Sequence, residues 1–309
     1  MEKEVLYELK SLYRDNFRVT GFSFGEGKKS LCMIGNMRGN EYQQIYICSQ
    51  LVKKLKELED AGRIIPDHKI TVIPSGNPYS MNIEKRFWPT DNTDINRMFP
   101  GYNLGETTQR IAGGIFEALM GYQYGIQFTS FYMPGDFTPH VRIMDTGRDY
   151  LEKAKEFGLP YIVKRKPRPY DTATLNYNWQ IWDTDSFSLY SNTTERIDEE
   201  SAQQMVQSVM NFMIAEGMIT GQKYQSYQSQ LISDGKLIPV RPYSAGLFQS
   251  RIKVGQRVER DQQLAEIIDP YDGAVMEKLN SPVTGTVFFV HNHPMTYANT
   301  AVLKIVPGE

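Results

Sequence analysis

The residues best suited to do chemistry lie in polar loops, and the first such loop is IGNMRGNE at 34–41. It follows an apolar run and precedes a long helical pattern, so it is expected to join a strand to a helix. Loops of this kind often hold a catalytic metal, and Glu41 offers a carboxylate at the end of this one. Arg38 stands where another ligand would be expected, although a guanidinium is always protonated and has no lone pair to donate.

The second loop contains TDINRMFPG at 93–101, the most specific motif of the chain. A guanidinium can grip a carboxylate through two parallel hydrogen bonds, and a neighbouring amide can supply another donor, so Asn96 and Arg97 suit a carboxylate ligand. The alternative is that Arg97 pairs with Asp94 and only shapes the loop. Arg86, in the earlier polar stretch EKRFWP, favours an anion-binding pocket.

We expect these side chains to line a polar cleft. His140 and Arg142 follow the strand predicted at 124–131, and we expect them on a loop that faces the cleft. The expected members are Arg38, Glu41, Arg86, Asn96, Arg97, His140 and Arg142. These arginines are more than ion pairing with one glutamate requires. A ligand with two or more carboxylates, or with a phosphate, would suit the additional positive charge.

Two further segments border this region. KRKPRP at 164–169 is basic but interrupted by prolines, which favours a solvated edge or a substrate-facing strand end over a polyanion site. TLNYNWQIWDTDSFSLY at 174–190 is rich in aromatic and amide side chains and is a candidate for another wall of the cleft. The alternative is core packing, which we favour for Trp179 and Trp182.

The overall composition is that of an ordinary globular protein. The 309 residues favour two domains, and a net charge of −2 with 23% charged residues gives no reason to expect nucleic acid or an anionic membrane as partner. Cys32 and Cys48 lie in apolar patterns, as buried thiols do in a reducing compartment. We see no signal peptide and no apolar run near the roughly 20 residues that span a bilayer, so we expect a cytoplasmic protein. The expected partner is a small-molecule carboxylate, and whether the chain forms a homo-oligomer stays open.

Strand and helix patterns alternate along residues 1–222, which predicts an α/β domain with a mixed, mostly parallel sheet and helices on both faces. Apolar residues between 5 and 13 follow helical spacing and predict a short opening helix. The other expected helices are 42–61, 107–120, 148–157 and one capped by Asp198; the expected strands are 18–25, 29–35, 68–74, 124–131, 160–165 and 186–190.

Residues 223–309 differ in their sequence pattern, which consists of short strand-like runs separated by glycine and proline. This predicts a small all-β barrel or sandwich. KVGQRVERDQQLAEI and SPVTGTVFFV resemble the two halves of a biotinyl/lipoyl-like hammerhead. A carrier of that kind needs a lysine on the hairpin tip, where Ala274 and Val275 stand instead and Lys278 is displaced, so we expect a structural barrel.

The order of these motifs resembles the succinylglutamate desuccinylase/aspartoacylase family of zinc-carboxypeptidase-like deacylases. The shared order is a loop with Glu41 before a helix, then IPSGNP, an arginine, DINRMFPG, a helix and a C-terminal β domain, so it covers essentially the whole chain. The resemblance implies a carboxypeptidase-like α/β domain and an N-acyl amino acid substrate. It also implies that Asn96 and Arg97 bind the substrate carboxylate.

The chain departs from this family at the metal site. The family holds zinc through His-x-x-Glu in the first loop and a second His after a later strand. The matching positions are Glu41 for the Glu, Arg38 for the first His, Phe128 for the second His and Ile126 for an Asp that orients it. The general-base Glu of the family corresponds to Tyr190, and Glu195 is the nearest acid downstream.

These departures leave the family's zinc site mostly without ligands. A catalytic zinc needs three protein ligands and a water, so we expect no cofactor, and Glu41 would be a metal ligand only if a metal binds. The chain has four histidines, His68, His140, His291 and His293. We expect His68 at the surface and HNHP as an exposed turn. A site rebuilt from His140 near Asp136, or from the HNHP histidines, stays open.

Two functions follow from these observations. The first is a deacylase-type hydrolase that acts on an N-acyl amino acid or related carboxylate with its zinc site altered or lost. Glu41 would then be the ligand or general base, and Tyr190 would stand at the family's catalytic position. The second is a non-catalytic carboxylate-binding protein that serves as a sensor or scaffold. Ordinary zinc-dependent hydrolysis is not expected.

Overall fold

The computed structural model describes residues 1–11 and 15–308, and the chain forms two compact units. The first unit comprises Met1–Ser130 and His140–Gln230, and the second comprises Phe131–Pro139 and Leu231–Glu309. This division differs from a single cut after residue 222, because the strand at Gly135–Phe137 pairs with a strand of the second unit.

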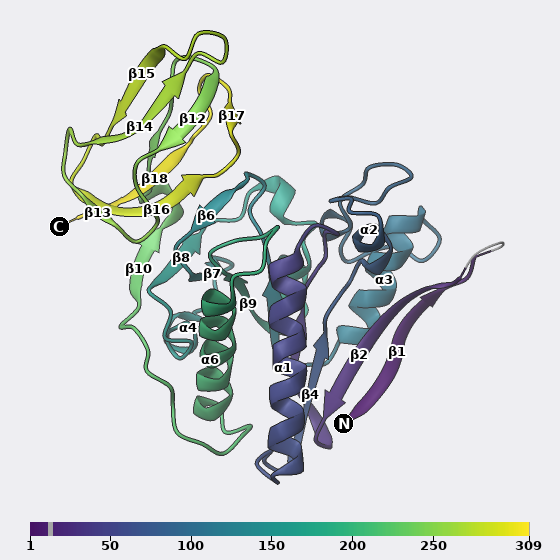
Figure 1. Ribbon diagram of the computed structural model, residues 1–309. Helices are drawn as coiled ribbons and strands as arrows, with labels where there is room; N and C mark the ends of the chain where they lie inside the picture. The colour runs from purple at the N-terminus through teal and green to yellow at the C-terminus, as the bar shows by residue number, and fades with distance from the viewer. Residues whose placement is uncertain (12–14, 309) are drawn as a thin grey trace. The chain divides into compact units, whose positions relative to one another are not determined.

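A mixed sheet forms the centre of the first unit (Figure 1). Within the described residues its strand order is β1-β2-β4-β3-β5-β9-β7-β8-β10. The bounds are β1 Glu2–Leu9, β2 Phe17–Phe24, β3 Gly27–Ile34, β4 Asp67–Ile73, β5 Tyr124–Phe128, β7 His140–Met144, β8 Tyr161–Arg165, β9 Asp185–Tyr190 and β10 Gln230–Ser233. β4, β3, β5 and β9 run parallel to one another, whereas β2 is antiparallel to β1 and β4, and β7 is antiparallel to β9.

The opening helix predicted for residues 5–13 is wrong, because the described part of that segment forms β1, antiparallel to β2. A register shift between Val5 and Tyr7 interrupts the alternation of the strand, so that Leu6 and Tyr7 both pack against the core. The resulting spacing of apolar residues imitates a helical period. Residues 12–14 of the predicted helix lie outside the described residues.

Helices cover both faces of the sheet. α1 (Tyr42–Asp60) and α6 (Glu199–Ala215) lie side by side on one face (Figure 1) and bury a core that includes Phe128, Phe187 and Phe212. The second core, on the other face, includes residues of α3 (Thr107–Leu119) and α5 (Leu175–Ile181). The shorter elements are α2 Pro78–Asn82, η1 Ile95–Arg97, α4 Leu151–Lys155 and η2 Pro169–Asp171.

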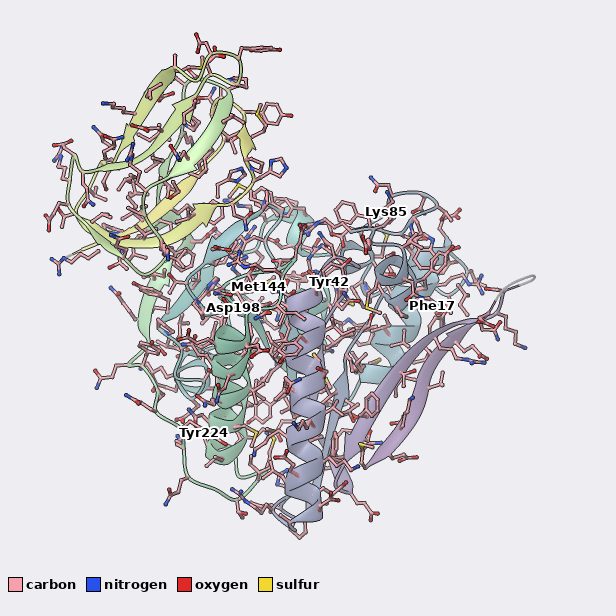
Figure 2. All side chains as sticks on the ribbon, viewed as in Figure 1. Phe17, Tyr42, Lys85, Met144, Asp198 and Tyr224 are labelled. Atoms are coloured by element: carbon pink, nitrogen blue, oxygen red, sulfur yellow. The ribbon has the colours of Figure 1, made fainter. Side chains whose placement is uncertain are left out.

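The predicted cap of α6 is confirmed, since the side chain of Asp198 accepts a hydrogen bond from the backbone N–H of Ser201. Figure 2 shows Asp198 at the start of α6 and Tyr42 at the start of α1. Gln43 joins these helix ends, because its side-chain amide donates to the carbonyl of Asp198 and accepts from the Asp198 N–H, each at 2.9 Å. Both long helices therefore begin at the same edge of the sheet.

One segment expected to be an irregular loop is a strand. Residues His140–Met144 form β7, which pairs with β8 on one side and β9 on the other, and all five residues are buried. The segment is short, and His140 and Arg142 are polar residues that alternate with apolar ones. Its strand character depends on its two neighbours in the sheet.

The second unit is built from antiparallel strands, as predicted for the C-terminal region. One sheet has the order β11-β18-β16-β13, with β6 also paired to β16, and the other has the order β15-β14-β12-β17. The bounds are β6 Gly135–Phe137, β11 Ile238–Val240, β12 Gly246–Ser250, β13 Arg257–Val258, β14 Gln263–Ile268, β15 Val275–Asn280, β16 Gly285–His291, β17 Met295–Thr296, β18 Leu303–Pro307 and the turn η3 Asp234–Lys236. No helix in the described parts of either unit is long and apolar enough to cross a bilayer.

Candidate carboxylate site

The carboxyl ends of β3, β5 and β9 lie together at one edge of the sheet, since the three strands are parallel neighbours. The loops that leave this edge carry Glu41, Ser130 and Asn192. In open α/β sheets this edge is where ligands bind. The loop IGNMRGNE is thus placed where the sequence predicted, between β3 and α1.

Arg38 is the centre of a buried ion-pair network. Its Nη1 donates to Glu41 Oε1 at 3.2 Å, and its backbone N–H donates to Glu41 Oε2 at 3.1 Å. Its Nε and Nη2 both donate to Asp94 Oδ2, at 3.1 and 2.9 Å. Glu41 is fully buried and the Arg38 side chain is only 8% exposed. One guanidinium therefore binds two carboxylates that come from two distant loops.

The charges in this network shift the pKa values of both arginines, in opposite directions. Burial by itself lowers the pKa of Arg38, but the neighbouring carboxylates of Asp94 and Glu41 raise it above the ordinary arginine value. The pKa of Arg86 is lowered, first by burial and then by the positive charge of Arg38. Arg38 is thus a permanent cation at the site.

Ser130 and Asn40 extend the network, and sequence reasoning missed both. The Ser130 hydroxyl donates to Glu41 Oε1 at 2.6 Å, and Arg86 Nη2 lies 3.5 Å from the same hydroxyl. Arg86 Nη1 donates to Asn40 Oδ1 at 3.2 Å, and Asn40 in turn donates to Glu195 at 2.5 Å. Asn40 lies in the loop IGNMRGNE beside the residues that the sequence singled out, and Ser130 follows β5, so both stand in loops at the carboxyl ends of strands.

The DINR motif lies beside this network. Asp94 caps η1 by accepting from the Asn96 N–H at 3.0 Å, and Gln127 donates to Asn96 Oδ1 at 2.8 Å. The Asn96 oxygen is thus engaged as an acceptor, and the Nδ2 group is the donor of this side chain. Arg97 Nε lies 3.7 Å from Asp94 and its Nη1 donates to the carbonyl of Tyr170 at 2.7 Å. Asp94 therefore has its shorter contacts with Arg38, and the Arg97 side chain stays 38% exposed.

His140, Arg142 and Tyr190 form a second buried group. The rings of His140 and Tyr190 stack with centroids 4.7 Å apart, and Arg142 Nη1 donates to the Tyr190 hydroxyl at 2.8 Å. The Arg142 guanidinium carbon also lies 4.4 Å from the centroid of the Tyr190 ring. The expectation that His140 and Arg142 stand on a loop is wrong, because both belong to β7, whose pairing with β9 places His140 opposite Tyr190.

Phe128 and Ile126 belong to the core on the α1 and α6 side of the sheet. Because side chains alternate along a strand, Gln127 and Thr129 face the opposite side, where Gln127 meets Asn96. The residue after β5 that touches Glu41 is Ser130. Phe128 thus contacts other apolar side chains instead of Glu41.

The aromatic segment 174–190 divides between core and surface. Trp179 is buried against Gly125 of β5, as the core-packing alternative predicted, whereas Trp182 is 52% exposed. The basic segment 164–169 runs from the end of β8 to η2, and Arg165 and Arg168 both donate to the Tyr170 hydroxyl, at 2.8 and 2.9 Å.

The four histidines are divided between the two units. His68 lies in β4 and its Nδ1 is 2.7 Å from the Ser30 hydroxyl. His291 is the last residue of β16 and is buried, so only His293 fits the expected exposed turn. His291, His293 and Asp136 belong to the second unit. Across residues 1–11 and 15–308, no three His, Cys, Asp or Glu side chains are grouped so that they could hold a metal ion.

Comparison with known proteins identifies the family. A family model described as the succinylglutamate desuccinylase/aspartoacylase catalytic domain matches residues 27–214. The N-alpha-acetyl-L-2,4-diaminobutyric acid deacetylase of Halomonas elongata is 24% identical over 274 residues, which cover 81% of this chain and 73% of the deacetylase.

Solved structures share the fold. A succinylglutamate desuccinylase from Silicibacter sp. TM1040 superimposes with a TM-score of 0.82 at 17% identity, covering 98% of this chain and 92% of the other. The product-bound ectoine utilization protein EutE from Ruegeria pomeroyi gives 0.78 at 18% identity, covering 94% and 89%. An aspartoacylase family protein from Mesorhizobium loti gives 0.78 at 21%, covering 97% and 93%. Since the family model also spans more than half of the sequence, the chain belongs to the succinylglutamate desuccinylase/aspartoacylase family of deacylase-type hydrolases.

Proposed function

We propose that this protein binds the carboxylate of an N-acyl amino acid or a related small molecule, and that it does so without the zinc-dependent hydrolysis of its family. The observation that carries the proposal is the contact of Arg38 with Glu41 and Asp94, at 3.2 and 2.9 Å. Arg38 occupies the sequence position of the family's first zinc-binding His, and its side chain is a permanent cation paired with both carboxylates.

Zinc does not fit the side chains of this site. Glu41 is the one family ligand present, and its two oxygens already accept from Arg38 and Ser130. A guanidinium cannot coordinate a metal, and its charge would repel one. Phe128, at the family's second His position, packs in the core, and the next two residues, Thr129 and Ser130, carry hydroxyls instead of imidazoles.

The carboxylate clamp consists of Arg97 and Asn96, and Arg86 belongs to the Arg38 network through Asn40 and Ser130. The Arg97 side chain is partly exposed, and Asn96 keeps its Nδ2 donor while Gln127 donates to its Oδ1. These groups match the fork geometry that a carboxylate accepts. The name of the Halomonas relative, an N-acetyl amino acid deacetylase, supports the choice of an N-acyl amino acid as ligand.

Hydrolysis by a rearranged site is the second candidate, and the hydrogen bond of 2.6 Å between Ser130 and Glu41 favours it. Glu41 would act as general base on a water molecule, with Tyr190 as a further group that exchanges protons. Water would first have to displace one of the donors that Glu41 already has, which is why this candidate ranks second.

Metal analysis of protein purified without chelator, together with hydrolysis and calorimetric binding assays on N-acetyl amino acids, tests the proposal. We expect no bound metal, no turnover and saturable binding that Arg97→Ala abolishes. Arg18→Ala, which removes an arginine from an exposed ion pair with Glu8, is the matched control and should bind as the wild type does. Stoichiometric zinc with turnover would overturn the proposal, and turnover without metal would favour the second candidate.

A further inference from the structure

A cavity lies beside β1, the edge strand of the large sheet in the first unit. Its volume is about 770 Å³, which is within the range of cavities that hold small molecules. The described residues that line it come from the end of β1, the start of β2, α2, the loop after α2 and the start of α3. They do not include Arg38, Asn96 or Arg97, so the cavity is distinct from the carboxylate site.

Three aromatic rings from separate stretches of the chain form one wall of the cavity. The ring centroid of Trp88 lies 5.6 Å from that of Phe17, which is labelled in Figure 2, and 5.2 Å from that of Tyr79. Phe17 and Trp88 are only 8% and 2% exposed and belong to the second core of the unit. The wall is therefore held by the core behind it, and a ligand would mainly contact the half-buried side chains of Tyr79 and Leu9.

The rim of the cavity carries charged side chains. The exposed ones are Lys10, Asp15, Arg18 and Arg110. Arg18 is paired with Glu8 at 2.7 Å. Arg110 lies near the start of α3, and in the part of the chain that the structure describes its guanidinium forms no ion pair. A carboxylate could therefore bind this guanidinium through two parallel hydrogen bonds.

We propose that the cavity binds a small molecule that combines a planar apolar ring with a carboxylate. The ring lies against Tyr79 and Leu9, and the carboxylate binds Arg110. Contact with the Tyr79 ring stabilises a ring ligand in addition to the burial of its apolar surface, and a charge-assisted hydrogen bond is roughly twice as strong as a neutral one. The inference goes beyond the proposed function, because it adds a second ligand site whose residues take no part in the carboxylate clamp.

Calorimetric titration of the full chain with naphthylacetate tests the proposal. Acetate lacks the ring and naphthylethanol lacks the charge, so we expect each to bind at least about tenfold more weakly than naphthylacetate. Arg110→Gln should weaken the binding of naphthylacetate at least about tenfold, and its exposed position should leave folding intact. Arg260→Gln removes an exposed arginine of the second unit and is the matched control, with an expected change of less than about twofold.

Two further variants change the wall and the rim. Tyr79→Leu keeps an apolar side chain but removes the ring, and should weaken the binding of naphthylacetate about two- to tenfold. Asp15→Asn removes the carboxylate of the rim, so naphthylacetate should bind as tightly as to the wild type or more tightly. No saturable binding of naphthylacetate, or equal affinity for naphthylethanol, would overturn the proposal. Equal losses in Arg110→Gln and Arg260→Gln would also overturn it.

Arg97→Ala separates the cavity from the carboxylate clamp. The clamp would also accept the carboxylate of naphthylacetate, but binding in the cavity should persist in Arg97→Ala and fall in Arg110→Gln. Binding that is lost in Arg97→Ala and kept in Arg110→Gln would place the ligand at the clamp and overturn the cavity site. Binding of naphthylacetate that depends on Arg110, without any binding of N-acetyl amino acids, would support the cavity site and remove the clamp.

Discussion

Arg38 holds Asp94 through two of its nitrogens, Nε and Nη2, which donate to the same carboxylate oxygen at 3.1 and 2.9 Å. Asp94 stands two residues before Asn96, and it caps the short helix that carries Asn96 and Arg97. The arginine of the loop IGNMRGNE is therefore joined directly to the motif TDINRMFPG. A substitution in the first loop should thus alter the position of Asp94 and, with it, of Asn96 and Arg97.

Replacing Arg38 by alanine should destabilise the protein by about 3–5 kcal/mol, because it leaves the buried carboxylate of Glu41 without its cation. Urea unfolding followed by circular dichroism measures the loss. Arg18→Ala, which breaks an exposed ion pair, should cost no more than about 1 kcal/mol.

A second change checks the cause of that loss. Glu41→Gln in the Arg38→Ala background removes the unpaired charge and should recover part of the stability. If Arg38→Ala costs no more than Arg18→Ala, the ion-pair network does not hold the loop.

A zinc site should return only when two imidazoles are placed beside Glu41. Thr129 follows β5 on the face that Gln127 shares with Asn96, so we expect Arg38→His/Thr129→His to retain zinc after dialysis. Arg38→His alone supplies too few ligands and should retain none. Arg38→His/Phe128→His is the control, since Phe128 is buried in the core and should lose stability instead of gaining zinc. Atomic absorption on the dialysed proteins decides between these outcomes.

The cap of α6 should make stability depend on pH. Burial alone raises the pKa of Asp198, but hydrogen bonds from Asn192 and from the Ser201 N–H lower it below its usual value. A lowered carboxyl pKa stabilises the fold above the unfolded value of about 3.9, and this contribution disappears as the pH falls through the folded value.

Asp198→Ala should therefore cost about 1 kcal/mol at neutral pH and progressively less below about pH 4. Thermal unfolding of the wild type and the variant across this range gives the difference at each pH. A difference that stays constant with pH would show that the charge of the cap contributes nothing.

Gly125 should tolerate no side chain. A Cβ at this position of β5 would lie 2.7 Å from the indole of Trp179, which is buried in the core. Gly125→Ala should therefore destabilise the fold by about 1–3 kcal/mol, measured by urea unfolding. Gly235 has no heavy atom within 4 Å of an added Cβ, so Gly235→Ala should be close to neutral. Equal stability of the two variants would contradict the tight packing of Trp179 on β5.

The sequence by itself determined the elements whose period is long and regular. The expected helices from Tyr42, from Thr107 and after Asp198 match α1, α3 and α6, because each buries an apolar stripe on its neighbours. It also determined the family, through motifs that stay contiguous along the chain, and it placed an arginine where a metal ligand was expected.

Tertiary structure decided what depends on distant partners. The bulged strand β1 carries apolar residues at helical spacing, and β7 is a strand only because β8 and β9 flank it. The contacts of Arg38 with Asp94 and of Ser130 with Glu41 join residues that are 56 and 89 positions apart. Local patterns cannot predict such pairs, because the sheet order that brings the loops together is set by the packing of the whole unit.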